Sequence, residues 1–348
     1  MKLGDFVYPI PKQLIAEYPI EPKESARMLA LNRRTGEIHD KTIGDLIDYI
    51  QPGDCVVLNE TKVFPAKVLG NKEKTDAEIE VLMLRELNKT DNLWDVLVDP
   101  ARKVRIGNKI YFDNYKFYCE VIDNTTNRGR TVRFSYNDNL LAVVERIGKM
   151  ALPEYIKRPS EPKDKEYYQT EYANPQYLTS IGPPSAGLHI SNDFLKKFKE
   201  KGVRVAKVNT SIGQAIFDQI EVEDLTKHRM YAEPFEITRE NAELINKSLK
   251  NKKKIIAIGS SVARALESSY LTTLAIKPNK GWTDKFIYPS YEFRIVSALL
   301  TNFHLPKTPT LLLACAFGGT DYVFKAYRRA IKNNYRFYVF GDSLFIHN

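Results

Sequence analysis

The segment KKIIAIGSSVARALES brings a glycine, two hydroxyls and two charged side chains to the start of a predicted helix. Gly259 permits a tight turn, and the free N–H groups beside Ser260 and Ser261 could receive an anion or the polar edge of a ligand. Arg264 and Glu267 are three residues apart, so they share a helix face and could pair. An ordinary helix cap with a surface ion pair would leave the same pattern. The full patterns of a Rossmann dinucleotide site or a P-loop are absent, which disfavours both.

Two histidines stand in segments that could carry proton transfer. His189 in GPPSAGLHISNDF lies beside a predicted helix start, and His304 in TNFHLPKT precedes a proline. Either could transfer a proton or bond a ligand, although a structural role is the commoner one for a lone histidine. HxxxH and CxxC spacings are absent, and the three cysteines are far apart, so we expect no zinc site and no disulfide framework.

Basic and aromatic residues suggest contact with a nucleic acid. The chain has 52 Lys and Arg against 43 Asp and Glu, a net charge of +9, which favours an anionic partner. Trp282 in GWTDKFIYP could stack on a base or could be a core aromatic. The predicted helix Asp321–Asn333 has one basic face, which could bind phosphates or simply be solvated, made of Lys325, Arg328, Arg329 and Lys332.

Alternating strands and helices must position these residues. Thr42–Ile50 has the apolar spacing of a helix, and DCVVLNE reads as a buried strand. After Gly148 we expect helices at Asp193–Lys201 and Arg239–Leu249, strands at VRVAKV and KKIIAIG, and a short buried helix in TPTLLLACAFGG.

The stretch from about Pro65 to Arg146 has the residue pattern of strands rather than of alternating strands and helices. Short alternating, β-branched runs separated by Asn, Asp and Gly turns predict a small antiparallel barrel or sandwich. The fold class is therefore α/β, with a discontinuous α/β catalytic domain of residues 1–64 and 149–348 and an inserted β-barrel domain of residues 65–148. Neither a signal-peptide run nor about 20 consecutive apolar residues occurs, so we expect a cytoplasmic protein.

Taken together, the segments resemble the S-adenosylmethionine:tRNA ribosyltransferase-isomerase family. FVYPIPKQLIAEYP resembles the family's F-x-Y-x-L-P-x-x-L-I-A block, and GDCVVLNETKVFPA resembles the block ending in N-x-T-K-V-x-P-A. PPSAGLHI and GSSVARALE are similar to A-P-T-A-G-L-H-F and G-T-T-x-x-R-x-L-E, while GWTDKFIYP and TNFHLP are unchanged. The blocks run in order from Phe6 to Asp342, which makes the resemblance highly specific.

The resemblance implies an α/β domain with an inserted barrel and a defined reaction. The ribosyl part of S-adenosylmethionine is transferred to the aminomethyl group of 7-aminomethyl-7-deazaguanine at the wobble position of tRNA and isomerised. The product is epoxyqueuosine-tRNA, and adenine and methionine are released. The implied co-substrate is S-adenosylmethionine and the implied partner is the precursor tRNA. We expect no metal, no membrane and no obligate protein partner, hence a monomer.

The matching blocks supply the candidate site residues. For catalysis we expect His189 first, His304 second, and Glu267. The remaining candidates divide by partner. For the donor or the base they are Arg264, Gly259, Ser260, Ser261, Asn59, Thr61, Lys62, Asp284, Lys285 and Trp282; for tRNA they are Lys325, Arg328, Arg329 and Lys332.

The sequence also departs from the family. TSIGQAIF stands where L-H-V-G-x-G-T-F is usual, so Ser211 replaces a histidine and Ala215 a glycine; Ile190 also replaces a phenylalanine. The loss of an ionisable group leaves an alternative open, a tRNA-binding homologue with weakened catalysis. A methyltransferase is disfavoured, because its E/D-x-G-x-G loop is absent.

Overall fold

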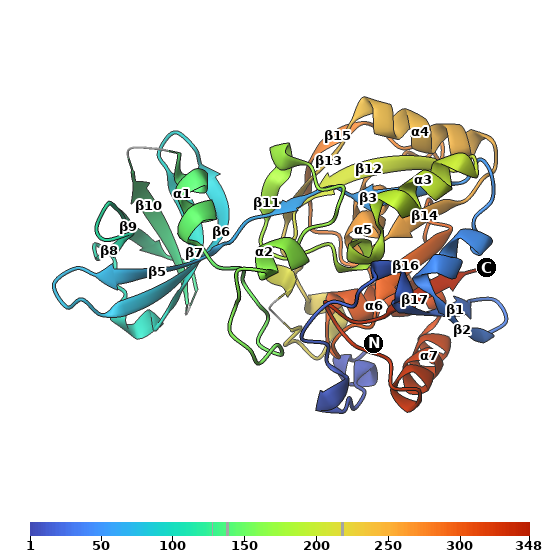
Figure 1. Cartoon of the computed structure of the whole chain (residues 1–348), viewed down its shortest axis with the longest axis horizontal. Helices are drawn as coiled ribbons and strands as arrows, with labels where there is room; N and C mark the ends of the chain where they lie inside the picture. Colours follow the sequence, from blue (N-terminus) through green and yellow to red (C-terminus); the bar gives the residue numbers. More distant parts are fainter. Residues whose placement is uncertain (127, 137–138, 217–218) are drawn as a thin grey trace.

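The larger part of the chain is built on one mixed sheet (Figure 1). The computed structural model describes residues 1–126, 128–136, 139–216 and 219–348. The sheet has nine strands in the order β15-β13-β12-β3-β14-β16-β17-β1-β2. Their bounds are β1 Arg27–Asn32, β2 Ile38–Thr42, β3 Cys55–Asn59, β12 Arg204–Thr210, β13 Glu233–Ile237, β14 Ile255–Ile258, β15 Asn279–Thr283, β16 Ala298–Asn302 and β17 Ser343–His347.

The four central strands β12, β3, β14 and β16 are parallel. Every residue of β3, β14 and β16 is buried, which explains their continuous apolar runs, because helices cover both faces of a parallel sheet. The covering helices are α3 (Asn192–Glu200), α4 (Arg239–Lys250), α5 (Ser260–Ser269), α6 (Pro309–Gly318) and α7 (Thr320–Lys332).

Successive residues of β3 divide the core between the two faces. Val56 packs in a cluster with Phe194 of α3, and Val57 packs in a second cluster with Ile245 of α4 and Val262 of α5. This alternation is what the two-residue period of a strand requires. The sheet therefore carries α3 on one face and α4 and α5 on the other (Figure 1).

A closed barrel lies beside the large sheet (Figure 1). In strand β9, buried residues alternate with half-buried ones, which is typical of a small barrel filled by side chains. Leu140 and Val144 of helix α1 (Leu140–Ile147) pack against its core. In the order β10-β7-β6-β5-β8-β9, the strands are β10 Gly129–Ser135, β7 Leu93–Asp99, β6 Glu78–Asn88, β5 Lys67–Lys72, β8 Lys109–Phe112 and β9 Phe117–Asn124.

The predicted fold class is confirmed, and of the two β architectures the barrel is the right one. The domain limits at residues 65 and 148 stay a prediction. The predicted helix Thr42–Ile50 forms as a 3₁₀ helix, η4 (Ile43–Tyr49), in which Asp45 accepts from the Thr42 N–H at 2.8 Å. In the described ranges, a helix with the length and hydropathy of a membrane span is not found.

Short elements join these layers. Strands β4 (Lys62–Val63) and β11 (Leu178–Ser180) form a small parallel pair between the two parts. The remaining helical turns are η1 Leu3–Phe6, η2 Lys12–Leu14, η3 Lys23–Ser25, η5 Ala101–Lys103, α2 Asp164–Tyr167, η6 Pro175–Tyr177, η7 Ser185–His189, η8 Gln214–Ile216 and η9 Leu225–Lys227.

Candidate functional site

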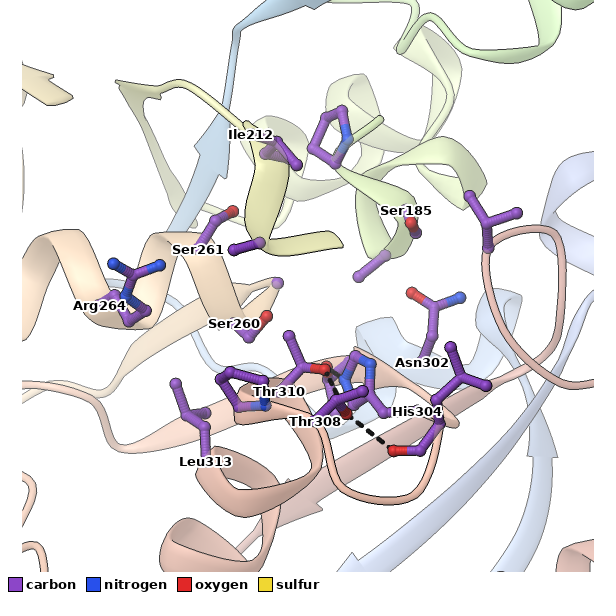
Figure 2. Close-up of a pocket in the computed structure, with 18 of the residues that line it drawn as sticks. Ser185, Ile212, Ser260, Ser261, Arg264, Asn302, His304, Thr308, Thr310 and Leu313 are labelled. Carbon is purple, nitrogen blue, oxygen red and sulfur yellow. Dashed lines mark hydrogen bonds between the residues drawn. The ribbon is translucent and has the colours of Figure 1, made fainter. Parts of the chain in front are cut away.

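A large pocket opens at the carboxyl ends of the central parallel strands (Figure 2). It encloses about 1160 Å³, counting the part open to solvent. The chain passes from β3 to β12 on one side and later to β14 and β16 on the other, so the strand order reverses at β3. Ligands of open α/β sheets bind at such a switch point. The pocket wall includes residues within two positions of the ends of β12, β14 and β16, namely Ile212, Gly259 and His304.

The turn between β14 and α5 brings the predicted hydroxyls to the pocket. Gly259 has a φ of +104°, which a residue with a side chain adopts only with strain. Its N–H donates to the Leu300 carbonyl at 2.8 Å, tying the end of β14 to β16. Gly259 caps α5 without a side chain, so the first N–H groups of the helix stay available beside Ser260 and Ser261, which line the pocket. The start of α5 could therefore receive a polar group of a ligand, as the sequence suggests.

The predicted pairing of Arg264 with Glu267 is wrong. Arg264 Nη1 instead donates to Glu233 Oε2 at 2.6 Å, and both residues line the pocket. The other Arg264 donors reach the carbonyls of Lys285 (3.2 Å) and Thr283 (3.1 Å). Helical spacing correctly put both side chains near one face, but α5 is almost wholly buried, so each charge finds its partner elsewhere in the fold.

Glu267 holds a loop behind α5. Its Oε1 accepts from the N–H groups of Ile295 (2.9 Å) and Val296 (3.0 Å), and its Oε2 accepts from Arg294 N–H (3.0 Å) and the Tyr291 hydroxyl (3.1 Å). Only 1% of the residue is exposed. Four accepted bonds use the capacity of a carboxylate, so the expected catalytic Glu267 lies away from the pocket as a structural anchor.

His304 is the histidine that faces the cavity (Figure 2). Its Nε2 lies 2.6 Å from the hydroxyl of Thr301, another wall residue. Burial lowers the pKa of His304 to about 3, because the charged imidazolium is poorly solvated there. The ring is therefore neutral at pH 7.

His189, the residue that we expected first for catalysis, is not among the described residues that line the pocket. Its Nε2 is 3.0 Å from the Gly341 carbonyl, so that nitrogen must carry the proton and donate. Burial lowers the pKa of His189 to about 4. The side chain of Asn302, which does line the pocket, donates to the same carbonyl at 3.4 Å. His189 therefore supports the wall from behind.

The structure separates Asn59 from Thr61 and Lys62, which we expected together at the donor or the base. Asn59 is buried and donates weakly to Ser261 Oγ at 3.5 Å, so it lies directly beneath the pocket wall. The Thr61 hydroxyl bonds Ser180 Oγ at 2.7 Å, and Lys62 Nζ lies 3.3 Å from Glu145 of α1. These last two face the β4–β11 pair and the barrel rather than the cavity.

The GWTDKFIYP block divides between the pocket and the surface. Lys285 lines the pocket, whereas Asp284 is exposed. Trp282 is 58% exposed, so the core-aromatic alternative is wrong. The guanidinium of Arg85, on barrel strand β6, lies 5.9 Å from the Trp282 ring centre, a distance at which a cation attracts the ring.

Two of the four residues on the basic face of α7 bind other residues of the protein. Lys325 Nζ donates to the Gly36 carbonyl at 3.1 Å, and Arg329 pairs with Asp40. Arg328 and Lys332 are exposed. Gly36 and Asp40 belong to the β1–β2 hairpin, so this face lies at the opposite edge of the sheet from β15.

Several wall residues were missed because neither their residue type nor their spacing distinguished them. Thr301 and Asn302 stand three and two residues before His304 in TNFHLP, and that block was the signal that could have found them. Thr308 donates to the Leu305 carbonyl at 2.7 Å and lies 3.1 Å from Thr310 Oγ1 (Figure 2). The other missed wall residues include Tyr155, Ser185, Glu233, Phe286 and Tyr338.

The departures from the family fall at the edge of the pocket. Ser211 is 5% exposed and donates to Thr179 Oγ1 at 2.7 Å, whereas its neighbour Ile212 lines the pocket. Ala215 also lines the pocket, and Ile190 is fully buried in the core cluster that contains Phe194. Among the residues that the structure describes, no group of three or more His, Cys, Asp and Glu side chains could hold a metal ion.

Comparison with known proteins gives matches along the whole chain. A family described as queuosine biosynthesis protein matches residues 3–346. The S-adenosylmethionine:tRNA ribosyltransferase-isomerase of Cytophaga hutchinsonii is 47% identical, covering 99% of this chain and 100% of that protein. The protein of the same name from Chloroherpeton thalassium is 48% identical with the same coverage. The crystal structure of an S-adenosylmethionine tRNA ribosyltransferase from Thermotoga maritima matches with a TM-score of 0.54 and 28% identity, covering 98% of this chain and 99% of that one.

Proposed function

The chain belongs to the queuosine biosynthesis protein family, and we propose that it performs the ribosyltransferase-isomerase reaction in the pocket beside α5 and β16. The reaction transfers the ribosyl part of S-adenosylmethionine to 7-aminomethyl-7-deazaguanine in tRNA and isomerises it. Epoxyqueuosine-tRNA forms, and adenine and methionine leave. The sulfonium makes the donor electrophilic, so the protein must mainly bind, orient and move protons.

The start of α5 binds the polar groups of the donor in this proposal. Free N–H groups at a helix N-terminus attract anions and hydrogen-bond acceptors, and S-adenosylmethionine carries a carboxylate and ribose hydroxyls. Ser260 and Ser261 add hydroxyls at the same place. Arg264 acts as a positioning residue, because its bonds to Thr283 and Lys285 fix the segment that brings Lys285 to the pocket.

His304 assists the departure of adenine. A pKa of about 3 makes its ring a weak base at pH 7 but leaves a neutral N–H that can donate a hydrogen bond. We assign the tautomer in which the Thr301 hydroxyl donates to Nε2, so that Nδ1 carries the proton. That N–H would stabilise negative charge on the leaving base.

Trp282 contacts the tRNA. It stands three residues before the wall residue Lys285 and exposes most of its ring. The target base must leave the anticodon stack to meet the donor, and an exposed indole can stack on a displaced base or on its neighbour. Arg328 and Lys332 are the two residues of the α7 basic face proposed to reach phosphates, because Lys325 and Arg329 already bind the β1–β2 hairpin.

One observation carries the proposal: groups from distant sequence blocks, including Ser185, Ser260 and His304, face one cavity (Figure 2). The test mixes purified protein with S-adenosylmethionine and precursor-bearing tRNA and measures released adenine by chromatography. We expect one adenine per modified tRNA. The control tRNA carries guanine at the wobble position and should yield none, because it lacks the aminomethyl nucleophile.

The same assay separates the alternatives. Tight tRNA binding without adenine release would identify a catalytically weakened tRNA-binding homologue, the possibility raised by Ser211. Formation of S-adenosylhomocysteine would identify a methyltransferase. His39, exposed on β2 far along the sheet from the pocket, provides a control histidine: His39→Ala should release adenine at the wild-type rate and His304→Ala should not.

A further inference from the structure

The loop that carries His304 to the pocket is held by the N-terminal arm, residues 3–16. The Phe6 carbonyl accepts from the Lys307 N–H at 3.2 Å, and the Tyr8 hydroxyl donates to the His304 carbonyl. Farther along, the arm pairs with Phe337, whose N–H donates to the Leu14 carbonyl at 2.8 Å. The arm therefore touches the pocket loop at two points and is itself anchored beyond it.

A second tyrosine holds the other side of the same residue. The His304 N–H donates to the hydroxyl of Tyr327, on α7, at 2.8 Å. Tyr8 is 7% exposed and Tyr327 1%, and their rings meet edge to face with centres 5.0 Å apart. Both the N–H and the carbonyl of His304 are thus bonded to phenol groups from elements far away in the sequence.

The side chain of His304 is fixed separately, by the Thr301 hydroxyl at 2.6 Å. Burial raises the pKa of both Tyr8 and Tyr327 far above the usual range, so both hydroxyls stay protonated at any working pH. Tyr8 itself lies outside the set of described residues that line the cavity.

We infer that Tyr8 is a positioning residue that holds His304 in place, so that the N-terminal arm completes the active site. The inference rests on the proposed role of His304. A hydrogen bond to a leaving group needs its donor placed closely, and a shift of about 1 Å can cost a hundredfold in rate. The tyrosine pair fixes the His304 backbone, and Thr301 then sets the ring.

Tyr8→Phe tests this with little change in packing, since it removes only the hydroxyl. One hydrogen bond contributes a factor of roughly 3 to 10 in an equilibrium, and we expect kcat for adenine release to fall by about that factor. The KM values for S-adenosylmethionine and tRNA should stay unchanged, because Tyr8 does not line the cavity. Loss of folded protein would also lower the apparent kcat at constant KM, so kcat is expressed per folded enzyme, measured by circular dichroism at the assay temperature, and is compared with a control variant of similar stability.

Tyr335→Phe is the matched control. Tyr335 is also a buried tyrosine, and its hydroxyl donates to Asp40 at 2.7 Å, away from the His304 loop. Both variants should show similar losses in thermal stability, and only Tyr8→Phe should lose kcat. Equal kcat values for wild type and Tyr8→Phe, or equal losses in both variants, would overturn the inference.

His304→Gln gives the second arm of the experiment. If Tyr8 acts through His304, Tyr8→Phe should have no further effect on kcat in the His304→Gln background. An undiminished effect there would refute the coupling. Should His304→Gln release no adenine, the comparison with Tyr335→Phe decides alone. A wild-type protein that releases no adenine would instead reject the proposed function, so the two failures are distinguishable.

Discussion

The buried ion pair between Arg264 and Glu233 allows the sharpest prediction. Arg264 Nη1 and Glu233 Oε2 are 2.6 Å apart, and the two side chains are 11% and 8% exposed. Arg264→Leu leaves the Glu233 carboxylate buried without its cation, which costs about 3–5 kcal/mol of the free energy of unfolding. The variant also strips a donor from the buried Thr283 carbonyl, which adds about 1–3 kcal/mol.

Urea unfolding followed by circular dichroism measures this loss. The control is Arg329→Leu, which breaks the pair with Asp40 on the surface of the hairpin. There the side chains are 44% and 38% exposed, and solvent screens the charges. We expect a loss of no more than about 1 kcal/mol in this control. The contrast between the two arginines separates burial from the mere presence of an ion pair.

The double variant Arg264→Leu/Glu233→Leu tests the reasoning itself. It leaves neither charge buried, so it should recover at least about 2 kcal/mol relative to the sum of the two single losses. It should nevertheless release adenine slowly, because the bonds from Arg264 to the Thr283 and Lys285 carbonyls, which help to hold the segment that carries Lys285, are lost. Single losses that add to within about 0.5 kcal/mol would refute the claim that the cost comes from a stranded charge.

Four further predictions concern the histidines and the tRNA surface. His304→Ala should lower kcat for adenine release by about 10²–10⁴-fold, measured against His39→Ala. The free energy of unfolding should fall as the pH drops from about 6.5 toward 4. Burial lowers the pKa of His189 to about 4 and that of His304 to about 3, so in this range the unfolded chain binds protons that the folded chain does not. Urea unfolding across this range should show a shallower slope in His189→Gln, and an unchanged slope would contradict the assignment. Trp282→Ala should raise the KM for tRNA by about 5- to 100-fold and leave the KM for S-adenosylmethionine constant, because one stacking contact with a base is lost. Arg328→Ala and Lys332→Ala should instead reduce the slope of log K for tRNA binding against log salt concentration by about one for each lost phosphate contact.

Much of the fold follows from local patterns that burial enforces. The run IIAI in β14 is buried on both faces of a parallel sheet, and the alternation in β9 fits one face of a closed barrel. Helix α4 appears where the 3.6-residue period predicts it. Closure of the barrel could not be read from the strands, because it depends on pairing between β7 and β10 and between β5 and β8, which are not consecutive in the sequence.

The site was less accessible to sequence reasoning, because long-range packing chooses the partners. Arg264 and Glu267 satisfy helical spacing, yet the partner of Arg264 comes from β13, 31 residues away. His189 and His304 stand in equally distinctive blocks, and only the fold decides that one faces the cavity while the other donates to Gly341 behind it. Sequence blocks thus indicate which segments meet, and packing determines which side chain of each segment is presented.

Ser211, which stands where the family has a histidine, also lies in a segment of the pocket wall without facing the cavity. Its hydroxyl donates to Thr179, which lies 3.4 Å from Thr61 Oγ1, and Thr61 bonds Ser180. Ser180 Oγ in turn accepts from the N–H of Ile212 at 2.9 Å, and Ile212 lines the pocket. The residue that replaces the family's histidine therefore belongs to a buried hydroxyl network that shapes the wall from behind. These hydrogen bonds give Ser211 a structural role, and the adenine-release assay decides whether the exchange of histidine for serine lowers turnover.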